Sequence, residues 1–424
     1  MEKFKIIKVL IVGLFFYQSA YGYNISDLVK ILIDKNQSNS SFTYDELIDD
    51  LNYKNADTLY IPKIDYSYTR SNSTTSTTST STTDSNINSI SATVNLYNGG
   101  FGQLNLVATE NRNQALNFLR QYQKELLIKE LIHGYNNLQS LVEKKNKQNE
   151  NIVFYQKRVQ EAEILFNANR ISKIDLLDFQ NELINAETLL LDYDRQIDNL
   201  MLQVNKLLDL EIQDEDINFD LKLDLNNQLI NKKSFKEILD SSYGQYLDYL
   251  EKTYLPELEM SKKDLRPSVD LTYSLSDNDQ FSNSVDHRRS STLSLQLSIP
   301  LYDGFKDENE FDISKYEYQK KLLDHKDLQK DLHNTYIESW NNHNYYTQKI
   351  ENQKKIIESL ELKLKGNEIL YKSQKISVTK LIESKNELNN AHNVLLDLET
   401  QNKYYLLDIL ILNADFDKLI NGLG

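Results

Sequence analysis

The sequence contains no cysteine and only 4 prolines and 11 glycines among its 424 residues. Without cysteine the chain can form no disulfide, no thiolate nucleophile, no cysteine-based zinc site and no lipid-modified cysteine. Average usage would give roughly 21 prolines and 30 glycines, so tight turns are scarce. Residues 63–255 and 301–424 contain no proline at all. The chain is therefore expected to consist of long elements, and a compact, turn-rich enzyme is disfavoured.

Basic residues are also in deficit, because 48 Lys and Arg oppose 63 Asp and Glu and leave a net charge of -15. A chain this acidic is a poor match for a phosphate backbone, so no nucleic-acid partner is expected. Hydrophobic residues nevertheless make up 40% of the chain, and 27 residues are tyrosine. This composition excludes disorder throughout, and tyrosine suits boundaries between apolar and wet surroundings.

Long apolar runs are missing after the N-terminus. The first 22 residues are predicted to be a secretory signal peptide, because lysines flank an apolar core at Ile6–Phe16 and small residues follow at Ala20 and Gly22. An uncleaved anchor is the alternative, but it needs about 20 apolar residues and this run is shorter. No later stretch of the sequence reaches that length, so any further passage through a bilayer must be made by strands.

An internal repeat organises the rest of the chain. A shift of 205 residues superimposes the two halves, and it pairs Pro62 with Pro267, Tyr68 with Tyr273, Gly99 with Gly304, Ser172 with Ser377 and Ala186 with Ala391. One register held over so long a stretch indicates two pseudo-equivalent structural units. The predicted organisation is a signal peptide at 1–22, a first repeat at 23–212, a connector at 213–228 and a second repeat at 229–424.

Each repeat begins with alternating apolar residues, which predict a pair of strands with one apolar and one hydroxyl-rich face. The apolar positions are Ile64, Tyr66 and Tyr68, then Ile90, Ala92, Val94 and Leu96, and in the second repeat Val269, Leu271, Tyr273 and Leu275, then Leu293, Leu295, Leu297, Ile299 and Leu301. Between the paired strands, the polar stretches Ser71–Asn86 and Ser276–Ser291 are expected to be exposed loops. An inter-domain linker is the alternative for the Ser/Thr tract.

The strands are followed by long predicted helices, at 101–165 and again at 305–370, each roughly 100 Å long at 1.5 Å per residue. After short breaks at 167–171 and 372–376, a second helix in each repeat carries a heptad seam of antiparallel coiled-coil type. The first seam is Leu176, Phe179, Leu183, Ala186, Leu190, Tyr193, Ile197, Leu200, Val204 and Leu207, and the second runs from Leu381 to Leu412. Further helices are expected near 25–57 and 235–264.

Four strands with one apolar face cannot close a barrel alone, so they require copies of themselves. A closed barrel with apolar residues outside and Ser, Thr and Asp inside has the pattern of an outer-membrane barrel. The long helices cannot lie inside such a bilayer and must project from it. The expected fold is thus mostly α with a membrane β-barrel portion.

The duplicated motifs resemble the TolC outer-membrane efflux protein family. They are the strand-to-helix junctions at 96–101 and 299–305, the helix tips at 165–178 and 370–383, and the Asn-Glu-Leu-x-Asn-Ala segments at 181–186 and 386–391. The resemblance implies a homotrimer with a 12-strand barrel in the outer membrane and a 12-helix periplasmic tunnel. It also implies an exit channel for tripartite efflux or type I secretion, working with a periplasmic adaptor protein and an inner-membrane transporter of RND or ABC type.

The resemblance further implies that acidic side chains and hydrogen bonds at the helix tips narrow a periplasmic entrance. The matching positions are Asp175 and Asp178 in the first tip and Lys380 and Glu383 in the second, with Tyr371 as the gate tyrosine and Asp175 its expected acceptor across the interface. The expected adaptor contacts are Asn169, Arg170, Ile171, Ser172, Gln374, Lys375, Ile376 and Ser377. The expected strand-to-helix junction residues are Gly99, Gly100, Pro300 and Gly304, where glycine allows a turn that a Cβ would obstruct.

The tips depart from the family pattern in three ways. Lys380 occupies a position that is acidic in the family, which leaves either a weaker cation-selective constriction or a local ion pair with Glu383. Ile376 stands where a gate arginine is expected. The turn glycine is replaced by Asn169 and by Gln374, and Asn tolerates the left-handed conformation better than Gln.

Catalytic interpretations find little support in the sequence. None of the six histidines lies three or four residues from another, so a helical metal pair is absent, and no phosphate-binding loop or nucleophile motif occurs. No cofactor and no metal are expected. The alternative function is a secreted coiled-coil stalk or adhesin-like protein, with an enzyme third. The exported substrate, drug, metal or protein, is not encoded in these patterns.

Overall fold

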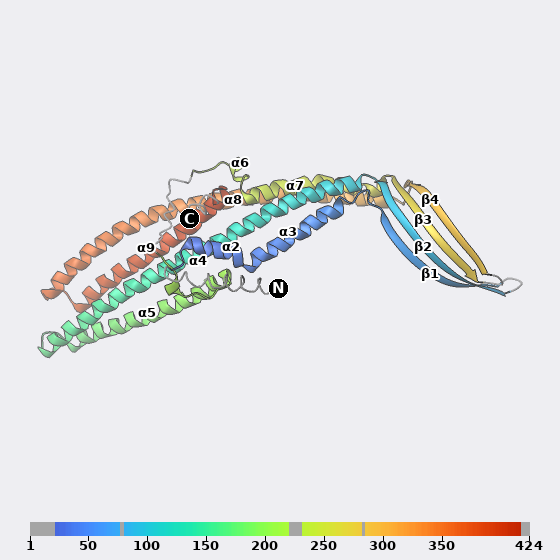
Figure 1. Ribbon diagram of the computed structural model, residues 1–424. Helices are drawn as coiled ribbons and strands as arrows, with labels where there is room; N and C mark the ends of the chain where they lie inside the picture. Colours follow the sequence, from blue (N-terminus) through green and yellow to red (C-terminus); the bar gives the residue numbers. More distant parts are fainter. Residues whose placement is uncertain (1–21, 77–79, 220–230, 282–284, 417–424) are drawn as a thin grey trace, which may run out of the picture. The chain divides into compact units, whose positions relative to one another are not determined.

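The computed structural model describes residues 22–76, 80–219, 231–281 and 285–416. The predicted signal peptide, up to residue 21, and much of the predicted connector lie outside the described residues. Helices make up most of the chain, together with one antiparallel sheet (Figure 1). The chain forms two compact units. The first contains Met1–Thr43, Arg120–Tyr243 and Asp331–Gly424, and the second contains Tyr44–Leu119 and Gly244–Lys330.

The second unit holds a four-stranded antiparallel sheet in the order β1-β2-β3-β4. Its strands are β1 (Lys63–Ser76), β2 (Thr80–Asn98), β3 (Ser268–Phe281) and β4 (Val285–Ser298). Lys63 opposes Thr93 in the first hairpin, and Ser268 opposes Ser298 in the second. Adding 205 to Lys63 and to Thr93 gives Ser268 and Ser298, so the two hairpins share one register. The sequence repeat is therefore also a structural repeat.

The strands are longer than the alternating apolar residues predicted, and the expectation of exposed loops at 71–86 and 276–291 was wrong. The described parts of both stretches continue the ladders. Hydroxyl and amide side chains join the strands across the first hairpin, with Ser71 Oγ 2.6 Å from Ser85 Oγ and Asn72 Nδ2 2.5 Å from Asp84 Oδ1. Threonine is β-branched and favours strands, so a polar Ser/Thr composition did not mean a loop.

One face of the sheet is apolar and uncovered within the chain, as the alternation predicted. Ile64 is 69% exposed, Leu293 is 69% exposed and Leu295 is 66% exposed. The opposite face carries small polar pairs, such as Ser67 Oγ 2.7 Å from Ser89 Oγ, and Asn95 donating to Asp270 over 2.8 Å. A monomeric soluble protein rarely exposes so large an apolar surface, so this face requires a partner.

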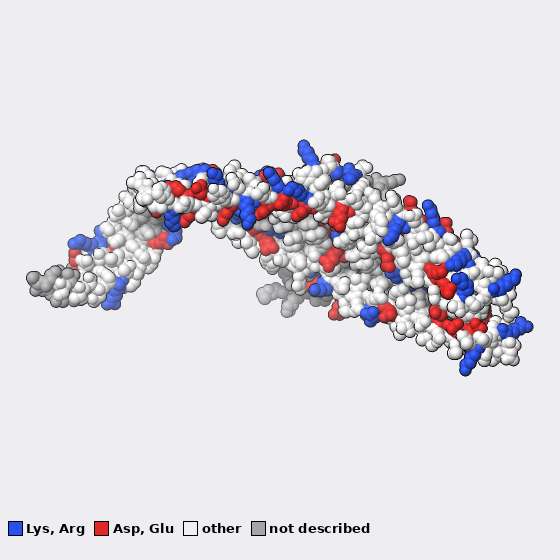
Figure 2. All heavy atoms as spheres, turned by 180° about the vertical axis from the view of Figure 1, so that it is seen from behind, with Lys and Arg blue, Asp and Glu red and all other residues white. Residues whose placement is uncertain are grey.

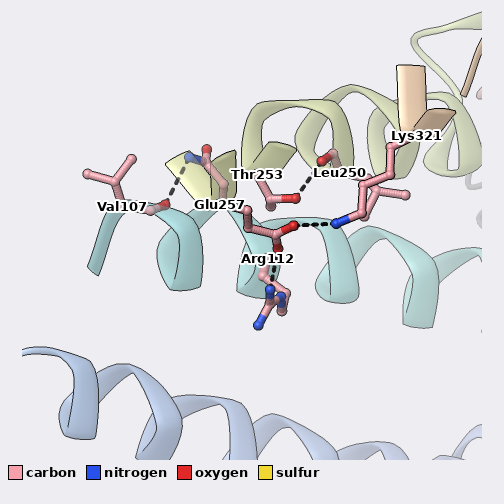
Figure 3. A network of polar contacts seen from close by, with 7 residues as sticks. Val107, Arg112, Leu250, Thr253, Glu257 and Lys321 are labelled. Carbon is pink, nitrogen blue, oxygen red and sulfur yellow. Dashed lines mark hydrogen bonds and ion pairs between the residues drawn. The ribbon is translucent and has the colours of Figure 1, made fainter. Parts of the chain in front are cut away.

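Helices connect to the sheet at both ends of each hairpin. The second unit contains parts of α3 (Gln37–Ala56), α4 (Phe101–Asn167), α7 (Ser242–Met260) and α8 (Lys306–Lys372). Glu257 joins three of these helices, because it accepts from Arg112 on α4 over 2.5 Å and from Lys321 on α8 over 2.7 Å (Figure 3). Burial of Glu257 opposes ionisation, but the two cations outweigh that effect and lower its pKa.

We expect Glu257→Gln to reduce the stability of the second unit by about 1 kcal/mol at neutral pH, because it removes the negative charge that Arg112 and Lys321 both contact and leaves one acceptor oxygen in place of two. A lowered folded-state pKa contributes stability above the unfolded value of about 4.3, and this contribution is lost as the pH falls through the folded value. Thermal unfolding across pH 3–7 should therefore show the wild type and the variant converging in acid. Glu308→Gln on α8 is the matched control, and an equal effect of both substitutions would contradict the prediction.

The first unit is helical. It contains α2 (Ile25–Lys35), α5 (Lys173–Leu208), α6 (Phe235–Ile238), α9 (Val378–Leu412) and the remaining parts of α4 and α8. The single helix predicted over 25–57 is instead two helices that meet at Asn36. The Asn36 side chain donates to Leu207 O over 2.8 Å and accepts from Ser38 N over 2.8 Å. The helix predicted over 235–264 is likewise divided into α6, α7 and a 3₁₀ turn, η3 (Lys263–Leu265).

The heptad seams predicted for α5 and α9 lie at the interfaces of the first unit. The seam residues Phe179, Leu381 and Ile409 are fully buried. The long helices also bond to the returning helices at matched places, because Gln148 donates to Ala186 O over 2.8 Å and Gln353 donates to Ala391 O over 2.9 Å. These two contacts are 205 residues apart in both partners. Both repeats therefore build the same helical hairpin.

Charges of both signs lie interspersed along the helices on the face that Figure 2 shows. Some are ion pairs one turn apart, such as Lys252 with Asp248. Within the described residues, no helix is both long enough and apolar enough to cross a membrane.

Candidate functional site: the paired helix tips

The first unit contains two equivalent helix tips, where α4 turns into α5 and α8 turns into α9 (Figure 1). Both turns end the long helix in the same way. Arg170 N donates to Leu165 O over 2.8 Å and Lys375 N donates to Leu370 O over 2.9 Å. The residue before each of these donors is left-handed, with φ of 54° at Asn169 and 58° at Gln374. This is the hydrogen-bond pattern of a Schellman motif, in which glycine is usual at the left-handed position.

A serine then begins the returning helix at each tip. Ser172 Oγ accepts from Asp175 N over 3.1 Å, and Ser377 Oγ accepts from Lys380 N over 3.2 Å. Asp175 also accepts from Ser172 N, which completes a capping box in the first tip. Lys380 cannot return that bond and places a positive charge in the first turn of α9, where the helix dipole disfavours it. The departure noted in the sequence thus has a local structural consequence.

Lys380 forms the ion pair that the sequence left as its milder alternative. Its Nζ lies 2.9 Å from Glu383 Oε2, and both side chains are half exposed. The hydrogen bond between them raises the pKa of Lys380 and lowers the pKa of Glu383. The charge of Glu383 is therefore largely neutralised within its own helix. Asp175 and Asp178 remain the negative groups of the first tip.

The two tips pack on each other through an apolar cluster. Phe179 of α5 is fully buried, and it lies beside Val378 and Leu381 of α9. The ring of Tyr371 meets the ring of Phe179 edge to face, with 6.0 Å between the centroids. Burial raises the pKa of Tyr371, with Arg158 opposing the rise and the carboxylates of Glu161 and Asp175 adding to it. Tyr371 and Asp175 are thus neighbours within one chain, while the expected bond between copies stays a prediction.

Arg158 connects the two helical hairpins just above the tips, and sequence reasoning did not single it out. Its guanidinium lies 2.7 Å from Glu161 on α4 and 3.0 Å from Glu368 on α8, and its side chain is only 8% exposed. It also lies over the Phe154 ring, 4.9 Å from the centroid. The sequence places Ile376 where a gate arginine is expected, yet Arg158 supplies a buried arginine between the hairpins from another helix.

A second polar contact joins three helices in the same region. Tyr155 on α4 donates to Asn386 Oδ1 over 2.9 Å, and Asn386 Nδ2 lies 3.3 Å from Glu182 on α5. Burial raises the pKa of Tyr155, so it is a hydrogen-bond donor at any physiological pH. Asn386 belongs to the duplicated Asn-Glu-Leu segment, which could have pointed to this contact.

The residues expected to touch an adaptor are presented at the tips. Asn169, Arg170 and Ser172 are exposed in the first tip, and Gln374, Lys375 and Ser377 are exposed in the second, while Ile171 and Ile376 are partly covered. These side chains are accessible to contacts outside the chain, although the hydroxyls of Ser172 and Ser377 also cap the returning helices. Their role as adaptor contacts stays a prediction.

The strand-to-helix junctions lie in the second unit, and their glycines have the left-handed backbone conformation that glycine readily adopts. The φ angles are 67° at Gly99, 83° at Gly100 and 80° at Gly304. A Cβ on Gly99 would lie 2.9 Å from Arg266 Cβ, and Arg266 donates to Gly99 O over 2.8 Å. A Cβ on Gly304 would meet nothing within 4 Å. Pro300 follows the end of β4, where its missing donor is harmless.

Comparisons with known proteins agree with this architecture. Residues 51–209 match the outer membrane efflux protein family. Among solved structures, CusC aligns with a TM-score of 0.81 at 14% identity, over 94% of this chain and 95% of its own. VceC of Vibrio cholerae aligns with a TM-score of 0.77 at 10% identity, over 92% and 95%. CmeC of Campylobacter jejuni, an outer membrane channel, aligns with a TM-score of 0.77 at 12% identity, over 94% and 89%.

No curated protein matches the sequence. At identities this low the structural likeness shows the fold, and the family match supplies the sequence link. Residues 51–209 thus match the outer membrane efflux protein family in sequence, and the chain shares the fold of these solved outer-membrane channels over nearly its whole length.

Proposed function

We propose that the chain is the outer-membrane exit channel of a tripartite efflux or type I secretion system, in which three copies close one barrel and one periplasmic tunnel. The observation that carries the proposal is the uncovered apolar face of an incomplete sheet. Within the described residues, β1 and β4 are the two edges of that sheet. When three sheets join into a closed barrel in lipid, the edge strands gain hydrogen-bond partners and the apolar face contacts the lipid tails.

The repeat supplies a template for the missing contact. β2 pairs with β3 inside the chain, with Thr93 opposite Thr272 and Ser89 opposite Ser276. Adding 205 to the β2 residue and subtracting 205 from the β3 residue predicts that β4 pairs with β1 of the next copy. In that register Ser298 opposes Ser67, and Ser294 opposes Ser71. All four serines lie on the polar face, so the register preserves the separation of the two faces.

The junction glycines support the same arrangement. Gly99 packs against Lys263 and Arg266, which precede β3. Gly304, its equivalent at the end of β4, has open space around it. The residues that correspond to Lys263 and Arg266 are Thr58 and Ile61, which precede β1. Pairing of β4 with β1 of the next copy would bring these residues to Gly304.

Paired cysteines test this register, and the cysteine-free chain provides a clean background. We expect Ser298→Cys with Ser67→Cys, and separately Ser294→Cys with Ser71→Cys, to give covalent trimers on mild oxidation of intact membranes. Opposed Cβ atoms in antiparallel strands are about 4.5–5.5 Å apart, close to disulfide range. The control combines Ser298→Cys with Ser71→Cys, which are displaced by about 13 Å along the strand. Monomers from both matched pairs, or equal crosslinking in the control, would refute the register.

The finer roles follow from the tips. The exposed tip residues are proposed to bind a periplasmic adaptor, and opening of the tips on that contact is proposed to admit substrate from an inner-membrane transporter. The buried Arg158 contacts and the Phe179 cluster hold the two hairpins together and would have to yield for the tips to separate. The channel itself needs no cofactor for this passive role.

The ion pair between Lys380 and Glu383 removes part of the negative charge at the tips, which leads to a prediction about ion selectivity. We expect Lys380→Asp to make the channel more cation-selective, because it adds the carboxylate found at the equivalent position 175 and releases Glu383 from its ion pair. The measurement is the reversal potential of single channels in planar bilayers under a salt gradient. The control is Lys354→Asp, which makes the same charge change at an exposed position of α8 that lies away from the tip. Equal shifts in both variants would show that total charge, and not position, sets selectivity.

A further inference from the structure

A cluster of possible metal ligands lies in the β3–β4 hairpin, away from the helix tips and outside the channel proposal. It consists of Asp277 and Asp279 on β3 and His287 on β4, which we call the hairpin cluster. Each residue offers one ligand atom, and the three atoms lie within 4.8 Å of one another. His287 Nδ1 contacts Asp279 Oδ1, and His287 Nε2 lies 3.3 Å from Asp277 Oδ1.

The sheet geometry fixes this arrangement. Asp279 and His287 are directly opposed in the ladder, and Asp277 lies two residues from Asp279, on the same face of β3. The ligand-bearing positions therefore come from two adjacent strands of one rigid ladder and not from a mobile loop. Asp277 opposes Arg289, whose Nε lies 3.6 Å from Asp277 Oδ2. The other oxygen of this carboxylate, Oδ1, lies on the His287 side.

The oxygen turned toward His287 lacks a hydrogen-bond partner. The Asp277 side chain is 39% exposed, but its Oδ1 atom is shielded from solvent and accepts no hydrogen bond among the described residues, with His287 Nε2 3.3 Å away. A buried acceptor without a donor is costly, and a cation would satisfy it. Arg289 is 79% exposed, so its charge is largely screened by water and salt. The cluster thus offers two carboxylates and an imidazole with little opposing charge.

We propose that the hairpin cluster binds a divalent transition-metal ion, with zinc as the best fit. Imidazole together with carboxylates favours zinc over calcium or magnesium, which prefer all-oxygen sites. Ligand atoms around tetrahedral zinc are about 3.4 Å apart, since each bond is about 2.1 Å. In the structure the two carboxylates contact opposite nitrogens of the ring, and a single ion is bound by only one nitrogen. His287, whose side chain is 50% exposed, must therefore rotate to present one nitrogen between the two carboxylates. Three protein ligands leave a fourth position for water, and the bound ion would fasten β3 to β4.

The direct test is zinc titration of the full-length protein, purified in detergent and stripped with a chelator. We expect one zinc per chain by calorimetry. Loss of an outer-shell partner alone costs about 10–100-fold in metal affinity, so His287→Gln and Asp279→Asn, which remove ligands, should each weaken binding by at least about 100-fold. Asp286→Asn in the same hairpin and His392→Gln in α9 are matched controls that should bind as the wild type does.

Cobalt titration gives an independent readout of the coordination. The wild type should show the visible absorption of cobalt bound by nitrogen and oxygen ligands, and His287→Gln should lose it. Size-exclusion profiles that match the wild type will show that the variants are folded. Zinc binding that is unchanged in both ligand variants, or no stoichiometric binding by the wild type, would overturn the proposal. Neither readout depends on channel activity, so the proposed function stands or falls separately.

Discussion

Leu295→Arg should reduce the amount of membrane-embedded trimer at least tenfold, whereas Ser294→Arg on the neighbouring residue should be tolerated. Leu295 is 66% exposed on the apolar face of the sheet, and Ser294 lies on the opposite face of the same strand. A charge facing lipid near the middle of a bilayer costs about 2–4 kcal/mol, and a charge facing a wet lumen costs much less. All three copies of the trimer carry the substitution, so the energetic cost is incurred three times in each trimer.

Membrane fractionation followed by native electrophoresis measures this contrast, with total synthesis of both variants checked in whole cells. The two positions share the same strand, the same depth and the same added charge, and they differ only in the face they occupy. A trimer yield that falls equally in both variants, or in neither, would show that the apolar face does not contact lipid.

Arg158→Gln should both loosen the tips and raise single-channel conductance. The Arg158 side chain is 8% exposed and holds Glu161 and Glu368 at 2.7 Å and 3.0 Å. Removing one partner of a largely buried pair costs about 3–5 kcal/mol. The two glutamates are partly exposed, so we expect about 1–3 kcal/mol here. The bond to Glu368 is the part that spans from α4 to α8.

Planar-bilayer recording and thermal unfolding together separate a gating role from a purely structural one. Glu368→Gln should raise the conductance as Arg158→Gln does. Both substitutions remove the same contact between Arg158 and Glu368, so the double variant should raise the conductance little beyond either single variant. Arg195→Gln is the matched control, because Arg195 is 66% exposed and, among the residues that the structure describes, pairs with Asp192 over 3.5 Å. A lower melting temperature with unchanged conductance in Arg158→Gln would remove Arg158 from the gate.

Much of the fold was predictable because its periodicities are local. Alternation around Ile64 and Leu293 placed the apolar face, and the heptads around Phe179 and Leu388 placed the coiled-coil seams. The repeat of 205 residues then transferred each assignment to the other half. These signals depend only on neighbouring residues, and tertiary contacts did not override them. The family resemblance seen in the duplicated junctions and tips is confirmed by the comparisons.

Local composition gave the wrong prediction where contacts with distant residues decide the structure. The Ser/Thr-rich stretch from Ser71 was expected to be a loop, but its hydroxyls bond across the ladder and extend the strands. The helix expected over 25–57 is broken at Asn36, whose side chain bonds to Leu207 on another helix. No pattern near Asn36 announces a partner that is 171 residues away. Breaks of this kind depend on tertiary structure.

The tips show the same division between local and distant signals. The pairing of Lys380 with Glu383 could be read from a spacing of three residues on a helix, and the structure contains it. Arg158 and Glu368 are 210 residues apart, and neither stands out in its own helix. Only the packing of α4 against α8 identifies them. Long-range ion pairs that join hairpins are therefore the part of the site that sequence patterns miss.

We propose that three copies of this chain form one channel in the outer membrane. Mild-detergent extraction of separated inner and outer membranes, followed by native mass spectrometry of the purified chain, tests it most directly. We expect a trimer to be recovered from the outer-membrane fraction. A monomer recovered from the periplasm or the medium would contradict it and would support a secreted coiled-coil stalk instead.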